Sequence, residues 1–260
     1  MTDLQDAIAT IEHDQASPES VRQAELAASV DEVVRATALA YSEQSDSYAE
    51  VRQAQPWSWD IHLTATLLEQ MRERVSDGTV RMDGRRWRLL DVGAGYGRDI
   101  FTFAQESDVE PVALENAEGF VSHLRQAQAD GRIGRDGVVV ADMRDLGAIA
   151  DASFQCVRAH ATLHHLPEVS YGLGADQAVA EFRRVLVSGG LCYVTVKAGT
   201  GIDLIDTGEG LGGRFFQLFS PEQLTKLLER HGLSVVRLEE AVEHRTSGDV
   251  PWIFALAVAE

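Results

Sequence analysis

The chain has 260 residues, of which 45% are hydrophobic and 25% are charged, so disordered, collagen-like and coiled-coil chains are excluded. The net charge of -18 argues against nucleic acid and anionic membranes as partners. The longest uninterrupted apolar run, residues 252–259, is too short to span a bilayer, and the acidic first twenty residues lack a secretory signal. Cys156 and Cys192 lie in apolar stretches, which predicts reduced core residues and a cytoplasmic protein.

The first 85 residues are expected to be helical. A Ser-Pro-Glu start at residues 17–19 opens one predicted helix, and residues 59–75 form another at helical apolar spacing. A polar stretch with two tyrosines, residues 41–55, lies between them. We therefore predict a helical extension or cap over residues 1–85 and a cofactor-binding core over residues 86–260. The apolar stripe of the extension is buried either on the core, in a homodimer contact or as a substrate lid.

From residue 86 onward, strand and helix patterns alternate. Strands are predicted at residues 86–92, 110–115, 137–141, 153–159, 191–197, 233–238 and 252–258, and helices at residues 97–106, 117–130, 176–186 and 221–231. This alternation predicts an α/β fold with a mostly parallel sheet and helices on both faces. The last two strands have no helix between them, so the last should be antiparallel to its neighbour. The glycine-rich residues 199–213 are predicted to form a mobile loop.

The strongest local pattern is a glycine loop that follows the first strand of the core. Gly93, Gly95 and Gly97 give Gly-x-Gly-x-Gly, and Arg98 occupies the position of the third glycine in the dinucleotide fingerprint. Asp91 precedes the loop, which favours a ligand with a positive amino group over one with a pyrophosphate. A nicotinamide-dependent oxidoreductase is therefore the less favoured interpretation.

Two further acids follow the next two strands. Glu115 ends the second strand, where an acid commonly binds ribose hydroxyl groups, and Asp142 follows the third strand, where it can accept a hydrogen bond from an exocyclic amine. All three acids fall at the carboxyl ends of consecutive strands, which is the ligand-binding edge of such sheets.

These motifs in this order resemble the class I S-adenosylmethionine-dependent methyltransferases of the small-molecule type. The resemblance rests on residues 91–97, 115, 141–143, 159–167, 181–190 and 219–224, and it extends from about residue 41 to the end. It implies a Rossmann-like seven-stranded sheet whose seventh strand is antiparallel. It also implies S-adenosyl-L-methionine as cofactor and S-adenosyl-L-homocysteine as product.

The resemblance also implies roles for individual residues. The loop with Asp91, Gly93, Ala94 and Gly95 would wrap the methionine part of the cofactor. Further cofactor contacts are implied for residues on other segments: Glu115 with Asn116 at the ribose, Asp142 and Met143 at the adenine, His160 facing the cofactor and substrate, and Tyr48 and Trp57 as parts of a lid.

Methyl transfer needs mainly proximity and orientation. A general base adds roughly 10²–10⁴-fold where the acceptor must lose a proton. His160, His164 and His165 follow the fourth strand; His165 is the preferred base, and His160 the preferred cofactor or substrate contact. The alternative is a loop that binds its own backbone. No cysteine or carboxylate completes a metal site beside these histidines, so no metal is expected.

The segment after the fourth strand lacks the Asn/Asp-Pro-Pro-aromatic motif of enzymes that methylate amino groups of nucleic acids. Together with the charge, this predicts a small-molecule acceptor methylated at O, N or C, with no nucleic acid and no membrane as partner. Arg214 could bind a carboxylate of the substrate or pair with acids at the surface. The alternatives left open are a non-catalytic cofactor-binding regulatory module and a reaction that uses the sulfonium electrostatically.

Overall fold

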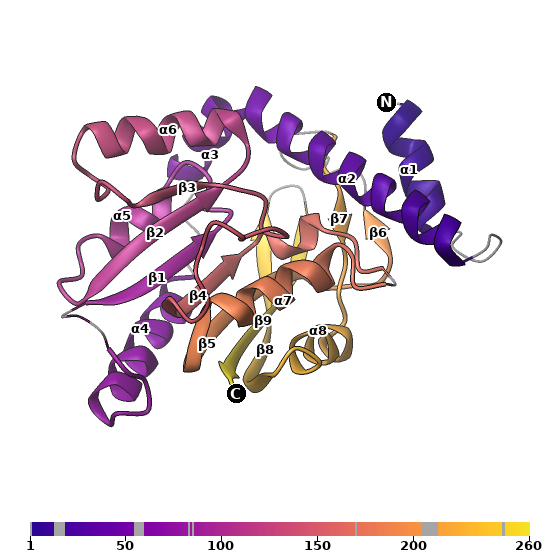
Figure 1. Cartoon of the computed structure of the whole chain (residues 1–260). Coiled ribbons are helices and arrows are strands. Elements are labelled where there is room, and N and C mark those ends of the chain that lie inside the picture. Colours follow the sequence, from indigo (N-terminus) through magenta and orange to yellow (C-terminus); the bar gives the residue numbers. More distant parts are fainter. Residues whose placement is uncertain are drawn as a thin grey trace.

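The computed structural model describes residues 2–12, 19–54, 60–82, 84, 86–169, 171–203, 213–245 and 248–260. Its centre is a seven-stranded sheet in the order β3-β2-β1-β4-β5-β9-β8 (Figure 1). The strands are β1 Trp87–Val92, β2 Val109–Glu115, β3 Val138–Val140, β4 Phe154–His160, β5 Leu186–Lys197, β8 Leu233–Arg245 and β9 Gly248–Ala259. β9 is antiparallel to both neighbours, and the other pairs are parallel, which confirms the predicted α/β sheet and its antiparallel final strand.

Helices cover both faces of this sheet. They are α1 Thr2–Glu12, α2 Glu19–Glu43, α3 Ser45–Ala54, α4 Asp60–Ser76, α5 Arg98–Phe103, α6 Glu118–Ala129, the 3-10 helix η1 Leu163–His165, α7 Ala175–Val185 and α8 Pro221–Glu229. On one face, Phe182 of α7 and Leu227 of α8 share a buried cluster with Val157 of β4. On the other face, Met71 of α4 packs with Leu89 of β1. The hydrophobic effect of burying both faces holds the strand ends, and thus the ligand-binding edge, in place.

Helices α2 and α3 lie along the carboxyl-end edge of the parallel strands, whereas α4 lies at the opposite end (Figure 1). The polar stretch over residues 41–55 is mostly helical, because α2 continues through Glu43 and α3 follows from Ser45 to Ala54. Glu43, Asp46, Ser47 and Glu50 are exposed there, whereas Ser45, Ala49 and Arg52 are buried. The apolar stripe of the extension packs within the chain, since Ile8 of α1 and Val33 of α2 form a cluster with Phe215. The homodimer contact and the division at residue 85 stay predictions.

Two strands of the C-terminal half are longer than predicted. β5 begins at Leu186 and continues through the glycines at 189 and 190, which as a pair suggest a turn. The pairing of β4 with β5 shifts in register between Phe154 and Cys156, beside these glycines. Gly189 has φ of 78°, a conformation that favours glycine. β8 and β9 extend as a hairpin beyond the sheet, and the charged residues in this part of the sequence obscure the alternation expected of a strand.

A small second sheet pairs β6 Ile202–Asp203 with β7 Phe216–Gln217, on either side of residues 204–212, which lie outside the described residues. Of the helices that the structure describes, none has the length and apolar character to cross a membrane.

The α2–α3 junction sits on the first turn of α6, where a glycine permits close approach. A Cβ atom at Gly119 would lie 2.5 Å from the backbone oxygen of Ser42 and 2.5 Å from the hydroxyl of Ser45. We expect Gly119→Ala to lower the free energy of unfolding by about 1–3 kcal/mol, because the junction must shift. Urea unfolding measures this, with Gly134→Ala as control, since a Cβ there meets no atom within 4 Å. A neutral Gly119→Ala would contradict this seating of α2 and α3.

Candidate functional site

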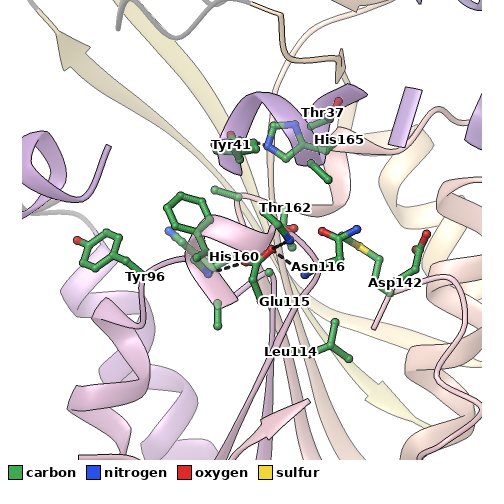
Figure 2. Close-up of a pocket in the computed structure, with 18 of the residues that line it drawn as sticks. Thr37, Tyr41, Tyr96, Leu114, Glu115, Asn116, Asp142, His160, Thr162 and His165 are labelled. Carbon is green, nitrogen blue, oxygen red and sulfur yellow. Dashed lines mark hydrogen bonds between the residues drawn. The ribbon is translucent and has the colours of Figure 1, made fainter. Parts of the chain in front are cut away.

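A cavity lies at the carboxyl ends of β1, β2 and β4, beneath α2 and α3. It measures about 1010 Å³ counting its open mouth, at the upper end of the usual size of ligand sites. Its floor is the glycine loop and the ends of the strands, and its roof is a face of α2 together with Tyr48 and Arg52 of α3. Figure 2 shows the side chains that surround it. A ligand in this cavity would be enclosed by segments that are distant in sequence.

The glycine loop is held by the carboxylate of Glu115. One carboxylate oxygen accepts a hydrogen bond from the backbone N–H of Gly95 at 2.8 Å, and the other accepts from the backbone N–H groups of Asn116 and Ala117, each at 2.9 Å. Burial raises the pKa of the Glu115 carboxyl, and these three N–H groups act in the opposite direction. Glu115 thus fixes the loop and also lines the cavity, and its predicted contact with a ribose stays a prediction.

The loop can approach a ligand closely because it carries no side chains at two positions. Gly93 and Gly95 have φ of 65° and 57°. A Cβ atom at Gly93 would lie 2.2 Å from the hydroxyl of Thr162, so this position is pressed against the segment after β4. A Cβ atom at Gly95 would meet no protein atom within 4 Å. Gly93, Ala94 and Gly95 therefore present backbone to the cavity.

Asp91 does not line the cavity, which corrects the expectation that it faces a ligand. It is 2% exposed, and its carboxylate accepts a hydrogen bond from Nη1 of Arg158 at 2.9 Å across the β1–β4 pair. Arg158 also pairs with Asp99, which does line the cavity, at 2.9 Å. Burial raises the pKa of Asp91 to about 6 despite Arg158. Burial would also raise the pKa of Asp99, but Arg158 and Arg98 outweigh it and hold that pKa below its usual range.

Asn116, Asp142 and Met143 all line the cavity. Figure 2 shows Asn116 and Asp142 to the right of His160. Arg144 already binds both carboxylate oxygens of Asp142, with its Nη2 2.7 Å from one and its Nε 3.2 Å from the other. Nη1 of Arg144 donates to Asp31 of α2 at 2.8 Å. Through Arg144, Asp142, which was predicted to bind adenine, is therefore connected to Asp31 of α2 in the roof.

The three histidines after β4 have different environments. His160 lines the cavity, and its Nδ1 lies 3.2 Å from the hydroxyl of Tyr193. His164 is 1% exposed, does not line the cavity and accepts a hydrogen bond from the backbone N–H of Lys197 at 3.2 Å. Burial, with the nearby cationic groups, lowers the pKa of His164 well below its usual value, so it is neutral. His165 lines the cavity, and both of its ring nitrogens lie within hydrogen-bond distance of a partner.

Sequence reasoning missed one face of α2. Val34, Thr37, Ala38 and Tyr41 line the cavity at i, i+3, i+4 and i+7, the spacing of one helical face. That period was the signal that would have found them. Tyr48 lines the cavity from α3, its predicted role in a lid stays a prediction, and Trp57 lies outside the described residues.

Other cavity residues follow or flank the predicted loop. Tyr96 is 8% exposed and lines the cavity, and its hydroxyl has no hydrogen-bond partner among the described residues. Burial raises the pKa of Tyr96 to about 12. Arg52 of α3 lines the cavity and lies 3.9 Å from Glu243 of the β8–β9 hairpin. Arg214, expected at a substrate carboxylate or at the surface, is instead 2% exposed, with Nη1 2.9 Å from the hydroxyl of Tyr41.

The residues present fit an adenosyl ligand. A carboxylate at the end of β2 suits the hydroxyl pair of a ribose, and Leu114 and Met143 give apolar walls beside it for a flat base. The loop backbone at Gly93–Gly95 supplies polar groups for an amino-acid portion. Within the described part of the chain, no three His, Cys, Asp or Glu side chains are grouped to hold a metal ion.

Residues 90–194 match the methyltransferase domain family. Over this part of the chain, the sequence is therefore similar to methyltransferase domains.

Solved structures share the fold at low sequence identity. A 1,6-didemethyltoxoflavin N1-methyltransferase from Burkholderia thailandensis, with 1,6-didemethyltoxoflavin and S-adenosylhomocysteine bound, is 19% identical with a TM-score of 0.58; the match covers 95% of this chain and 92% of that one. An S-adenosylmethionine-dependent methyltransferase from Methanosarcina mazei is 16% identical, with a TM-score of 0.54 and 71% and 96% covered. The [4+2]-cyclase SpnF is 17% identical, with a TM-score of 0.52 and 73% and 80% covered. These likenesses establish the fold.

The buried Asp91 predicts a pH dependence of stability. Its pKa of about 6 in the folded protein exceeds the ordinary 3.8, so the folded state binds this proton more tightly than the unfolded state. The stabilisation is therefore complete below about pH 4 and is lost as the pH rises through 6. We expect the wild type to lose unfolding free energy relative to Asp91→Asn over this range in urea titrations. Asp136→Asn, at an exposed site, should show no such trend. A difference that stays flat, or grows with pH, would contradict the assignment.

Proposed function

We propose that the protein transfers a methyl group from S-adenosylmethionine to a small-molecule acceptor at oxygen, nitrogen or carbon. The observation that carries the proposal is the enclosed cavity, in which the Glu115-bound glycine loop forms the floor and α2 and α3 form the roof. A roofed cavity suits a compact acceptor better than a polymer. The net charge of -18 adds repulsion against nucleic acid.

The chain's own residues would divide the cofactor between them. Glu115, beside Asn116, would accept hydrogen bonds from the ribose hydroxyl groups, and the backbone at Gly93–Gly95 would follow the methionine portion. The base would lie near Met143 and Asp142, with the α2 face over it. His160 would face the reacting end from β4. Tyr48 and Arg52 would close over the site from α3.

When bound, S-adenosylmethionine supplies a methyl group on a positively charged sulfur. The protein then needs chiefly to hold the acceptor atom in line with that methyl group and to exclude water. Orientation of this kind supplies about 7–11 kcal/mol in favourable cases. The roof of α2 and α3 supports both tasks, because it covers one side of the cavity and so limits its contact with bulk solvent.

One structural neighbour supports a small-molecule acceptor, and another favours a different function. The toxoflavin enzyme methylates a small molecule, which favours the same class of acceptor here. The cyclase SpnF has this fold, so the fold by itself does not require methyl transfer. A cofactor-binding module without turnover is the remaining alternative. Production of S-adenosylhomocysteine separates methyl transfer from both.

The cofactor assignment predicts a ligand-dependent change in thermal stability. S-adenosylmethionine and S-adenosylhomocysteine should raise the melting midpoint of the wild type, by about 2.7 kcal/mol of apparent stability at 100 times the dissociation constant, and NADH should not. The ligand-induced shift should shrink in Glu115→Ala, because the ribose loses its acceptor and the loop loses its support. Glu110→Ala, exposed on the same strand, is the matched control.

Labelled cofactor incubated with a metabolite extract or with nucleic acid then tests the acceptor. Label that appears only in nucleic acid would refute the small-molecule proposal. A shift caused by NADH alone would revive the oxidoreductase interpretation.

A further inference from the structure

The hydroxyl group of Tyr41 lies between a basic and a cationic side chain. It is 2.9 Å from Nε2 of His165 and 2.9 Å from Nη1 of Arg214. The other ring nitrogen of His165, Nδ1, is 2.8 Å from the backbone oxygen of Phe215. Figure 2 shows Tyr41 and His165 side by side at the cavity, above Glu115 in that view. Three segments of the chain therefore meet at one phenol: α2, η1 and the residues before β7.

The chemistry of the four groups fixes the direction of these hydrogen bonds. A backbone carbonyl only accepts, so Nδ1 of His165 carries the proton and donates it to Phe215. In the neutral ring Nε2 is then an acceptor, and the Tyr41 hydroxyl donates to it. Arginine only donates, so Arg214 donates to the oxygen of Tyr41. The hydrogen-bond order is Arg214 to Tyr41 to His165 to Phe215.

This order changes the role predicted for His165. Its Nε2 lone pair is directed at Tyr41, so Tyr41 stands between it and an acceptor in the cavity. We propose that Tyr41 is the catalytic residue that takes the acceptor's proton, and that His165 acts through it by taking the proton of Tyr41. This inference rests on the proposed methyl transfer and narrows its substrate class: the acceptor atom carries a proton, as in a hydroxyl, a primary or secondary amine or an N–H heterocycle.

The step balances in atoms and charge. The acceptor atom forms a bond to the transferred methyl carbon, and the bond between that carbon and the cofactor sulfur breaks, with its electron pair left on sulfur. The acceptor's proton passes to the oxygen of Tyr41 as the proton of Tyr41 passes to Nε2 of His165. The positive charge lost at sulfur reappears on the imidazolium ring, which keeps its bond to Phe215 and later releases the proton to solvent.

Arg214 completes the arrangement. It is 2% exposed, and its guanidinium lies 4.8 Å from the ring centre of Tyr41 and 5.4 Å from that of Phe216. A permanently charged donor at the phenol oxygen stabilises the negative charge that develops there while two protons move. The hydrogen bond to Phe215 holds the ring of His165 in the tautomer that this transfer requires.

The first test needs neither cofactor nor acceptor. Nitrogen-15 NMR of the histidine rings should show His165 neutral with its proton on Nδ1, and Tyr41→Phe should change the Nε2 resonance. His165 is assigned by its loss in His165→Ala. A proton on Nε2 in the neutral ring would overturn the proposal, because Nε2 could not then receive a proton from Tyr41.

The second test uses labelled S-adenosylmethionine with simple probes: a phenol, an aliphatic alcohol, a primary amine, an N–H heterocycle, a thioether and a tertiary amine. Label is expected only in probes whose nucleophile carries a proton. Tyr41→Phe should lower kcat by about 10²–10⁴-fold, while its S-adenosylhomocysteine affinity stays within about threefold of the wild type. Tyr171→Phe, outside the cavity, is the control and should keep wild-type kcat.

A third comparison separates proton transfer from mere support. Activity lost in His165→Ala should return in part when imidazole is added, because imidazole can accept the proton of Tyr41. His244→Ala, whose side chain is 79% exposed, should neither lose activity nor respond.

Label in the thioether or the tertiary amine, or absence of label from every proton-bearing probe, would overturn the proposal. A near wild-type kcat in Tyr41→Phe would also overturn it. So would a His165→Ala variant whose activity is not restored by imidazole. Failure to bind S-adenosylhomocysteine in the wild type would instead count against the proposed function.

Discussion

The carboxylate of Glu115 is the constraint on which the cofactor edge depends. It ends β2, accepts a hydrogen bond from the glycine loop and accepts two more at the start of the segment that leads into α6. A charged acceptor that is 6% exposed costs free energy unless it is hydrogen-bonded, and the three backbone N–H groups meet that need. The loop, in turn, keeps its left-handed glycines in place because the carboxylate holds it. One side chain thus sets the position of three segments and still reaches the cavity.

A second set of charges lies beneath the loop. Arg158, 1% exposed on β4, joins Asp91 of β1 to Asp99 at the start of α5. An ion pair so deeply buried adds little net stability compared with apolar residues, but removing one partner is costly. The ion pairs of Arg158 therefore contribute more to the specific arrangement of β1, β4 and α5 than to the free energy of unfolding. The cavity wall gains a carboxylate, Asp99, whose position depends on residues that do not touch a ligand.

The sequence predicted what depends on local pattern and chain order. The alternating strands, the glycine loop and Glu115 each follow from a short segment with its own periodicity or turn chemistry. What it could not predict depends on contacts between distant segments. The partner of Asp91 is invisible until β1 and β4 are adjacent, and the backbone oxygen of Phe215 has no sequence signature. The cavity face of α2 did have a signal in its helical period, but the polar residues around Tyr41 concealed it.

The link between Arg52 and Glu243 has a consequence for synthesis of the chain. Glu243 also accepts hydrogen bonds from Arg245 and Trp252, so the hairpin that ends the sheet reaches α3 in the roof. Arg214 donates a hydrogen bond to Tyr41, and the backbone oxygen of Phe215 lies 2.8 Å from Nδ1 of His165. All residues that line the cavity lie between residues 34 and 166, whereas these supporting residues come later in the chain. A nascent chain that ends between residues 166 and 213 would therefore contain every lining residue and none of these three supports.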